Sequence, residues 1–249
     1  MNTKILSGNQ LKIIAAVAMV IDHFAVIFCP QNHILRIIGR LAFPIFAFMI
    51  SEGAKYTSNK IKYLLTMFSV ASVCQIAYII YGQLEPFNIL ITFSLSTVMI
   101  FALQDVKSKL FDKKSSNTQT AVSFLVFLAS VTLVYFLNTL VLIDYGFAGC
   151  MVPVAASLFD FKGTNAPKSL KNLDKISLRV LCIIVPISFI IYRNMSLGDK
   201  CVSPFLLMAI PLLMLYSGKR GSAKLKYFFY LFYPLHLAVL EGIYMLINM

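Results

Sequence analysis

Apolar segments long enough to cross a lipid bilayer follow one another along almost the whole chain, with short polar links between them. Crossing the hydrocarbon core, about 30 Å thick, takes about 20 mainly apolar residues in a helix. Backbone polar groups inside lipid must be bonded within the protein, and the segments lack the alternation of barrel strands. The sequence therefore predicts an all-α bundle of about nine transmembrane helices in a single domain, residues 1–249. The predicted spans are residues 11–29, 34–53, 61–82, 88–104, 121–139, 143–160, 176–193, 203–217 and 227–247, of which the eighth is short enough to be kinked or re-entrant.

Composition and the distribution of positive charge exclude a soluble domain and predict the orientation in the membrane. Hydrophobic residues make up 59% of the chain, and the mean hydropathy is +0.81, far above the values of soluble domains. The net charge of +12 comes mostly from the loops after the second, fourth, sixth and eighth spans. That is the positive-inside pattern of cytoplasmic loops rather than a nucleic-acid surface. The amino terminus is therefore predicted to be cytoplasmic and the carboxyl terminus external, with no nucleic-acid partner.

The first span carries an acid and a histidine, Asp22 and His23, in the middle of its apolar residues. An Asp at mid-bilayer costs about 2.5–3.5 kcal/mol to insert, and such residues usually have a function and a partner. Ala15, Ala18 and Ala25 share one helical face with Asp22, and small residues let another helix approach closely. We therefore predict that Asp22 faces protein, and His23, a quarter turn away, need not share its partner. A signal peptide would not tolerate this pair, so the segment is predicted to be retained.

Under this orientation, polar residues of several spans meet in the outer half of the bundle. Pro44 and Pro234 each remove a helical hydrogen bond and leave a carbonyl that protein, water or ligand must satisfy. The second of these prolines precedes His236 and follows Tyr233, in an aromatic stretch, YFFYLFYPLH, dense enough to wall a cavity. The polar residues placed in the outer half are Asp22, His23, Arg36, Arg40, Gln75, Asn88, Thr92, Asp144 and Tyr145.

The intramembrane candidates have structural as well as functional interpretations. Arg40 either neutralises Asp22 in a buried ion pair or recognises an anionic oxygen with its guanidinium group, and the two are compatible. Histidines inside spans, His23 and His236, favour a catalytic or proton-handling role. His33, near the outer mouth, is expected to be a solvated loop residue.

The inner end and the loops offer a second set of candidates. Glu52 is expected to be a solvated helix end or the partner of Lys55. Basic loop residues such as Lys219 and Arg220 orient the protein and could also hold a phosphorylated cytoplasmic ligand. Five cysteines lie scattered with no metal-site spacing, so packing is their expected role. A disulfide between Cys29 and Cys201 is left open, and the cysteines are Cys29, Cys74, Cys150, Cys182 and Cys201.

Several sequence blocks, taken in order, resemble the signature blocks of the TraX family. They are LKIIAAVAMVIDH, LRIIGRLAFPIFAFMISEG, KYLL, NILITFSLS, DYGFAGCMVP and FFYLFYPLHLAVL, and they span nearly the whole chain. TraX of conjugative plasmids is associated with N-terminal acetylation of pilin, and the family looks related to a wider superfamily of membrane acyltransferases. The resemblance therefore implies a multi-pass acetyltransferase of the bacterial inner membrane. Acetyl-CoA would be the cytoplasmic acyl donor, without a metal, and the acceptor an amine or hydroxyl at the outer face, on a pilin-like peptide or a glycan.

The resemblance also implies roles for individual residues. His23 would act as the general base, Arg40 would stabilise the oxyanion, and Asp22 would hold Arg40. His236 would orient His23, position the acceptor or itself be the base, and the sequence leaves these three roles open. An α-amine, with a pKa of about 7.7–8.0, would need only a modest base. Substrate binding is assigned to Gln75, Asn88, Thr92, Asp144, Tyr145 and Tyr233, and donor binding to Glu52, Lys55, Lys62, Lys219 and Arg220.

Two other classes of protein fit the same residues. A proton-coupled membrane transporter would use the intramembrane charges and histidines as a proton or substrate path. Internal symmetry and broken-helix pairs would favour a transporter, and neither is evident in the sequence. A purely structural envelope protein would leave the intramembrane histidines without a reason.

Overall fold

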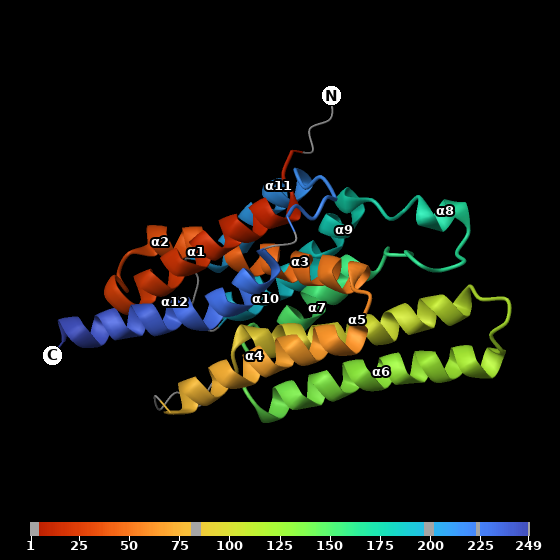
Figure 1. Ribbon diagram of the computed structural model, residues 1–249, viewed down its shortest axis with the longest axis horizontal. Coiled ribbons are helices and arrows are strands. Elements are labelled where there is room, and N and C mark those ends of the chain that lie inside the picture. Colours follow the sequence, from red (N-terminus) through yellow and green to blue (C-terminus); the bar gives the residue numbers. More distant parts are fainter. Residues whose placement is uncertain (1–4, 81–85, 197–201, 223–224, 249) are drawn as a thin grey trace. The chain divides into compact units, whose positions relative to one another are not determined.

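The computed structural model describes residues 5–80, 86–196, 202–222 and 225–248, which fold mainly into helices (Figure 1). Between the helices, this part of the chain contains turns, two isolated β-bridges and no β-strand. The predicted all-α class is confirmed.

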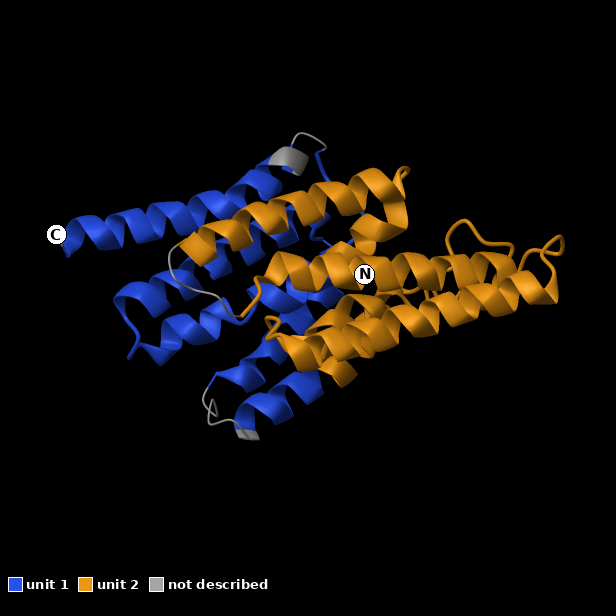
Figure 2. Ribbon diagram, turned by 90° about the horizontal axis from the view of Figure 1, so that it is seen from below, with its two compact units in different colours: residues 1–49, 187–249 blue, residues 50–186 orange. Residues whose placement is uncertain are grey.

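The chain divides into two compact units (Figure 2). Unit 1 comprises residues 1–49 and 187–249, and unit 2 comprises residues 50–186. Two helices, α3 (Ala42–Tyr56) and α10 (Ile184–Ser196), have residues in both units. The other elements of unit 1 are α1 (Gly8–Phe28), α2 (His33–Gly39), the 3-10 helix η1 (Ser203–Met208), α11 (Ala209–Met214) and α12 (Lys226–Ile247). Those of unit 2 are α4 (Lys60–Ile80), α5 (Ile89–Leu110), α6 (Asn117–Leu140), α7 (Gly146–Ser157), α8 (Lys168–Lys171) and α9 (Ile176–Cys182).

Seven helical stretches in the described part of the chain are long and apolar enough to cross a membrane, against about nine predicted spans. The other two predicted spans form shorter apolar helices, Gly146–Ser157 and Ser203–Met214. The helix Gly146–Ser157 begins later than the predicted span, residues 143–160, because Tyr145 and Gly146 both have positive φ angles, 58° and 62°. The second begins as a 3-10 helix with a proline in its first turn. The seven longer stretches are Gly8–Phe28, His33–Tyr56, Lys60–Ile80, Ile89–Leu110, Asn117–Leu140, Ile176–Met195 and Phe228–Ile247.

In unit 1, the start of α1 is joined to the loop that precedes α12. The amides of Gly8 and Asn9 donate hydrogen bonds to the carbonyls of Lys219 and Arg220, at 2.8 and 3.0 Å. The first amides of a helix have no partner within it, so this loop completes the start of α1. The same bonds hold the backbone of the loop in place.

The helices α1 and α12 of unit 1 pack together and run in the same direction. Near their starts, Nζ of Lys12 lies 5.5 Å from the centroid of the Phe229 ring. Near their ends, the ring centroids of Phe28 and Tyr244 are 6.0 Å apart. Residues near the start of α1 thus contact residues near the start of α12, and residues near the two ends contact each other. The two helices are therefore parallel.

In unit 2, α5 lies at the centre and packs against α4, α6 and α7. Its buried hydroxyl side chains, Ser94, Ser96 and Thr97, each donate to a carbonyl one turn earlier. Bonds of this kind satisfy the hydroxyl groups within the helix. The polar face of α5 can therefore be buried among apolar residues.

Candidate functional site

The two intramembrane histidines of unit 1 meet, although they are 213 residues apart in sequence. Nε2 of His236 on α12 lies 3.0 Å from Nδ1 of His23 on α1. The Phe232 ring stacks on the His236 ring with centroids 5.0 Å apart, and the Tyr233 ring meets it edge-on at 5.7 Å. His236 is 7% exposed, so this half of the pair is enclosed.

The hydrogen bonds of His236 determine the direction of proton donation in the pair. Its Nδ1 lies 2.9 Å from the carbonyl oxygen of Phe232, which can only accept, so this Nδ1 carries the hydrogen. In neutral His236 the other nitrogen, Nε2, is then an acceptor, and Nδ1–H of His23 donates to it. Neutral His23 therefore has its lone pair on Nε2. A histidine oriented by a second group in this way is the usual arrangement of a general base.

Asp22 and His23 have different partners, because adjacent residues on a helix point in different directions. Its Oδ1 lies 2.8 Å from Nη1 of Arg36 and 3.7 Å from Nη2 of Arg40. The predicted ion pair with Arg40 is present, but the shorter one is made by Arg36, which the sequence reasoning did not assign to Asp22. Both arginines reach α1 because they lie four residues apart at the end of α2.

Gly39 allows α2 to approach Asp22 closely. A Cβ atom built on Gly39 would overlap the Asp22 carboxyl group. We expect Gly39→Ala to force α2 away, to break the bond between Arg36 and Asp22, and to lower the free energy of unfolding by about 1–3 kcal/mol. A thermal unfolding midpoint in detergent measures this.

Gly242 on α12 is the matched control, because a Cβ there meets nothing within 4 Å. Gly242→Ala is expected to leave the midpoint unchanged or raise it, since Ala favours helix by about 1 kcal/mol over Gly. Equal midpoints for wild type and Gly39→Ala would refute the close-approach role.

The predicted substrate-binding residues of unit 2 are hydrogen-bonded within the protein. Oε1 of Gln75 accepts from the backbone N and the Nδ2 of Asn88, both at 2.9 Å. Asn88 is the N-cap of α5, and Oγ1 of Thr92 donates to the carbonyl of Asp144 at 2.9 Å. These bonds join α4, α5 and the turn before α7. A substrate role for these residues, and for Tyr145 beside them, stays a prediction.

Glu52 is neither a solvated helix end nor the partner of Lys55, so that expectation is wrong. Its side chain is buried, and Oε1 lies 2.5 Å from Nη1 of Arg179. Arg179 is 1% exposed and also bonds Oγ of Ser51 at 3.0 Å and the carbonyl of Ala156 at 2.7 Å. The sequence reasoning missed Arg179, although an arginine inside an apolar span was the signal that could have found it.

Lys55 is likewise held by carboxylates. Its Nζ lies 2.5 Å from Asp174 and 3.6 Å from Asp160. Nearby, Nζ of Lys107 donates to the carbonyls of Ser157 and Asp160 at 2.6 and 2.9 Å. Three cations and three acids balance in what we call the charged network of unit 2. Its ionised members are Glu52, Lys55, Lys107, Asp160, Asp174 and Arg179.

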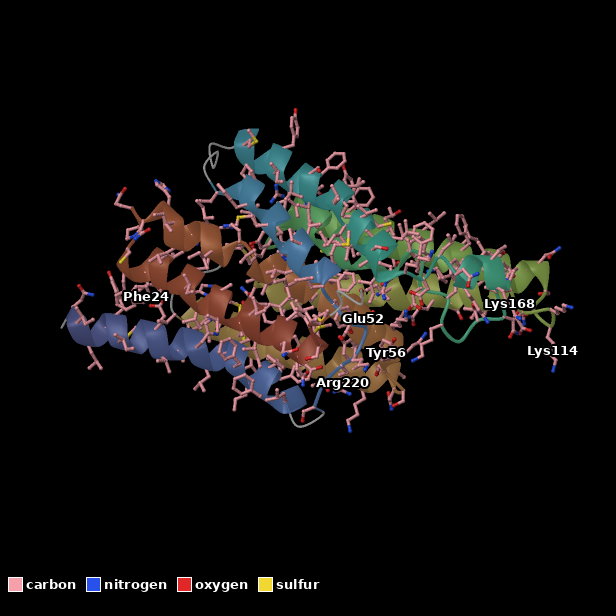
Figure 3. All side chains as sticks on the ribbon, turned by 90° about the horizontal axis from the view of Figure 1, so that it is seen from above. Phe24, Glu52, Tyr56, Lys114, Lys168 and Arg220 are labelled. Atoms are coloured by element: carbon pink, nitrogen blue, oxygen red, sulfur yellow. The ribbon has the colours of Figure 1, made fainter. Side chains whose placement is uncertain are left out.

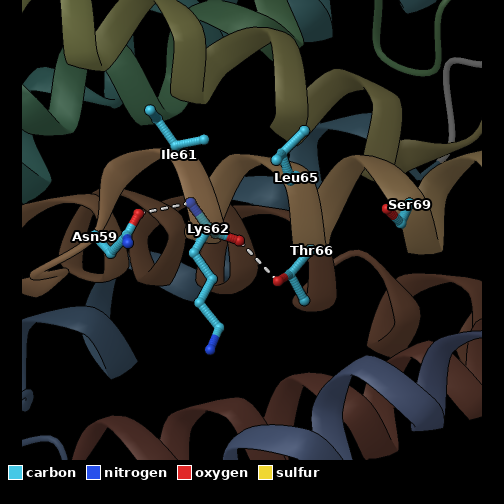
Figure 4. Close-up of a pocket in the computed structure, with 6 residues that line it drawn as sticks. All are labelled: Asn59, Ile61, Lys62, Leu65, Thr66 and Ser69. Carbon is cyan, nitrogen blue, oxygen red and sulfur yellow. Dashed lines mark hydrogen bonds between the residues drawn. The ribbon is translucent and has the colours of Figure 1, made fainter.

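The remaining donor-site candidates lie at the surface. Lys219 and Arg220 are exposed on the loop whose backbone is anchored to α1. Figure 3 labels Arg220. Lys62 lines an open pocket of about 440 Å³ on α4 (Figure 4). The other residues that line this pocket are Asn59, Ile61, Leu65, Thr66 and Ser69. Cys201, and with it the pairing to Cys29, lies outside the described residues.

Comparison with known proteins places this architecture in a family. The chain is 28% identical over 94% of its length to a probable fimbrial assembly protein, FimC of serogroup H1, from Dichelobacter nodosus, and covers 94% of that protein. It is 28% identical over 75% of its length to an uncharacterised protein of Rickettsia prowazekii, of which it covers 64%. No solved structure matches it. The model of the TraX protein family matches residues 7–244, so the chain belongs to the TraX family.

Proposed function

We propose that the protein is a membrane acyltransferase that moves an acetyl group from cytoplasmic acetyl-CoA to an amine or hydroxyl at the outer face. The oriented histidine pair is the observation that carries this proposal, because its hydrogen bonds leave the lone pair of His23 on Nε2, within a candidate membrane-spanning helix. A positioned base of this kind serves to remove a proton from an acceptor.

The residues of unit 1 suffice for the proton transfers of acyl transfer. As the acceptor nitrogen or oxygen bonds to the thioester carbonyl carbon, Nε2 of His23 takes its proton. His236 accepts a hydrogen bond from Nδ1–H of the His23 imidazolium that results, and so stabilises it. The guanidinium of Arg40, oriented by Asp22, stabilises the oxyanion that forms. When the carbon–sulfur bond breaks, His23 returns the proton to the departing sulfur.

The orientation proposed for this chemistry places the amino terminus in the cytoplasm and the carboxyl terminus outside. Two observations support it. The parallel packing of α1 and α12 requires an odd number of crossings in all. The loop with Lys219 and Arg220 is bonded to the start of α1, at the end that the basic loops mark as cytoplasmic. We place the protein in the bacterial inner membrane.

The acceptor that the family suggests is the amino terminus of a pilin-like peptide. A fimbrial assembly protein among the relatives supports this choice over a glycan. The donor site we assign to Lys219 and Arg220, with Lys62 as a further candidate, because these side chains are exposed while Glu52 and Lys55 are held in the charged network.

Binding of acetyl-CoA to the purified protein in nanodiscs tests the proposal. We expect saturable binding that weakens about tenfold or more in the double variant Lys219→Ala/Arg220→Ala, since each charge-assisted bond to a phosphate contributes about 1.5–3 kcal/mol. The control is Lys113→Ala/Lys114→Ala, which removes two exposed lysines from the turn after α5. Absence of binding by folded wild-type protein would refute the proposal that acetyl-CoA is the acyl donor. It would favour a proton-coupled transporter, for which proton flux would then be measured.

A further inference from the structure

The position of one hydrogen on the His236 ring decides whether His23 can act as a base. In a neutral histidine either ring nitrogen can carry the hydrogen. With the hydrogen on Nδ1 of His236, Nε2 accepts from Nδ1–H of His23, and the lone pair of His23 lies on its Nε2. With the hydrogen on Nε2, His236 would instead donate to Nδ1 of His23, whose own hydrogen would then lie on Nε2. Neutral His23 would have no lone pair there to take a proton.

Phe232 contacts the His236 ring in two ways. It lies four residues before His236 on α12, and residues four apart are neighbours on one face of a helix. Its carbonyl oxygen, 2.9 Å from Nδ1 of His236, can only accept, so this contact selects the hydrogen on Nδ1. Its ring stacks on the His236 ring, with 8° between the planes and 5.0 Å between the centroids. Aromatic pairs at such separations attract each other beyond the effect of the area that they bury.

The stacked Phe232 ring keeps the imidazole of His236 in the plane that both of its hydrogen bonds need. One bond points back along α12 to the Phe232 carbonyl, and the other points across to His23 on α1, so a tilt of the imidazole disturbs both. The rings of His23 and Tyr233 meet the imidazole at 47° and 65°, so neither lies parallel to it. The carbonyl can therefore select the hydrogen on Nδ1 because the stacked ring holds Nδ1 in front of it.

We propose that Phe232 is a positioning residue, which keeps His236 in the state that leaves the Nε2 lone pair of His23 available. Phe232 acts through the two histidines and exchanges no proton itself. The expected effect on rate rests on the proposed acyl transfer, whereas the position of the hydrogen is measured without donor or acceptor.

The first test is nuclear magnetic resonance of the isotopically labelled imidazole nitrogens, with the protein in nanodiscs. The chain has three histidines, so the variants His33→Ala and His236→Gln suffice to assign the signals. Neutral wild type is expected to carry the hydrogen on Nδ1 of both His23 and His236. Phe232→Leu keeps the carbonyl but removes the stacked ring. It should raise the fraction of His236 with its hydrogen on Nε2 by about two- to tenfold, the contribution of an aromatic pair.

The second test is acetyl transfer by the same variants. Phe232→Leu should lower kcat by about two- to tenfold with KM unchanged for donor and acceptor. Phe232→Tyr, which restores a ring of the same shape, should recover both the wild-type spectrum and the wild-type kcat. The control is Phe24→Leu, because Phe24 follows His23 on α1 but is exposed and packs on Phe28. This control should leave the spectrum and kcat unchanged.

The outcomes separate this inference from the proposed function. A wild-type spectrum in Phe232→Leu, or the same spectral change in Phe24→Leu, would overturn the role of Phe232 and leave acyl transfer standing. If the hydrogen shifts in Phe232→Leu as expected but wild type transfers no acetyl group, the role of Phe232 stands and the acyltransferase proposal fails. A hydrogen on Nε2 of His236 in wild type would overturn the inference outright.

Discussion

Replacement of His23 by alanine is expected to lower kcat/KM for acetyl transfer by about 10²–10⁴-fold, the usual contribution of a general base. The reason is the direction of the hydrogen bonds, because the chain from the Phe232 carbonyl through His236 leaves the available lone pair on His23. The measurement is the rate of release of free CoA from acetyl-CoA in the presence of acceptor peptide. Binding of acetyl-CoA should be unaffected, since the donor site is assigned elsewhere.

Variants of His236 separate orientation from base catalysis. In His236→Gln, the amide oxygen can still accept from Nδ1–H of His23, so we expect a smaller loss of kcat than in His236→Ala. If His236 were itself the base, both variants would lose activity equally, as glutamine cannot accept the acceptor's proton. His33→Ala is the matched control, since His33 lies exposed at the start of α2. Full turnover by folded His23→Ala protein would refute the mechanism.

Replacement of Arg179 by alanine is expected to lower the free energy of unfolding by about 3–5 kcal/mol. Its guanidinium group is bonded to Glu52, Ser51 and the carbonyl of Ala156, and the side chain is 1% exposed. Its loss leaves the buried Glu52 carboxylate without its arginine, which is why breaking a buried pair costs more than the pair contributes. Denaturant titration followed by circular dichroism measures the change, because the chain has no tryptophan.

A double variant distinguishes the cost of an unpaired charge from a loss of packing. Arg179→Met/Glu52→Gln removes both charges and keeps side chains of similar length, so it should be more stable than Arg179→Ala. Lys171→Ala, an exposed change at the end of α8, serves as the control and should lie within about 0.5 kcal/mol of wild type. Wild-type stability in Arg179→Ala would show that the charged network does not hold these helix ends together.

The sequence by itself determined the class of protein and much of where its helices lie. Apolar length and the requirement to bond every backbone group in lipid leave little choice but helices, and all nine predicted segments are helical over most of their length. The cost of burying charge in lipid also singled out Asp22 and His23 before any partner was known. Length alone did not show that the sixth and eighth segments form short helices, because a left-handed turn at Tyr145 and Gly146 and a 3-10 start decide this locally.

Only the tertiary structure decided which polar residues meet. His23 and His236 are 213 residues apart, and Glu52 and Arg179 are 127 apart, so no helical periodicity could relate them. Which residues pair within a membrane depends on which helices pack together, and the hydropathy of the segments does not predict that packing. The direction of the proton in the histidine pair follows from the Phe232 carbonyl, four residues before His236 on α12, and the packing of α12 on α1 decides that the other ring nitrogen of His236 meets His23.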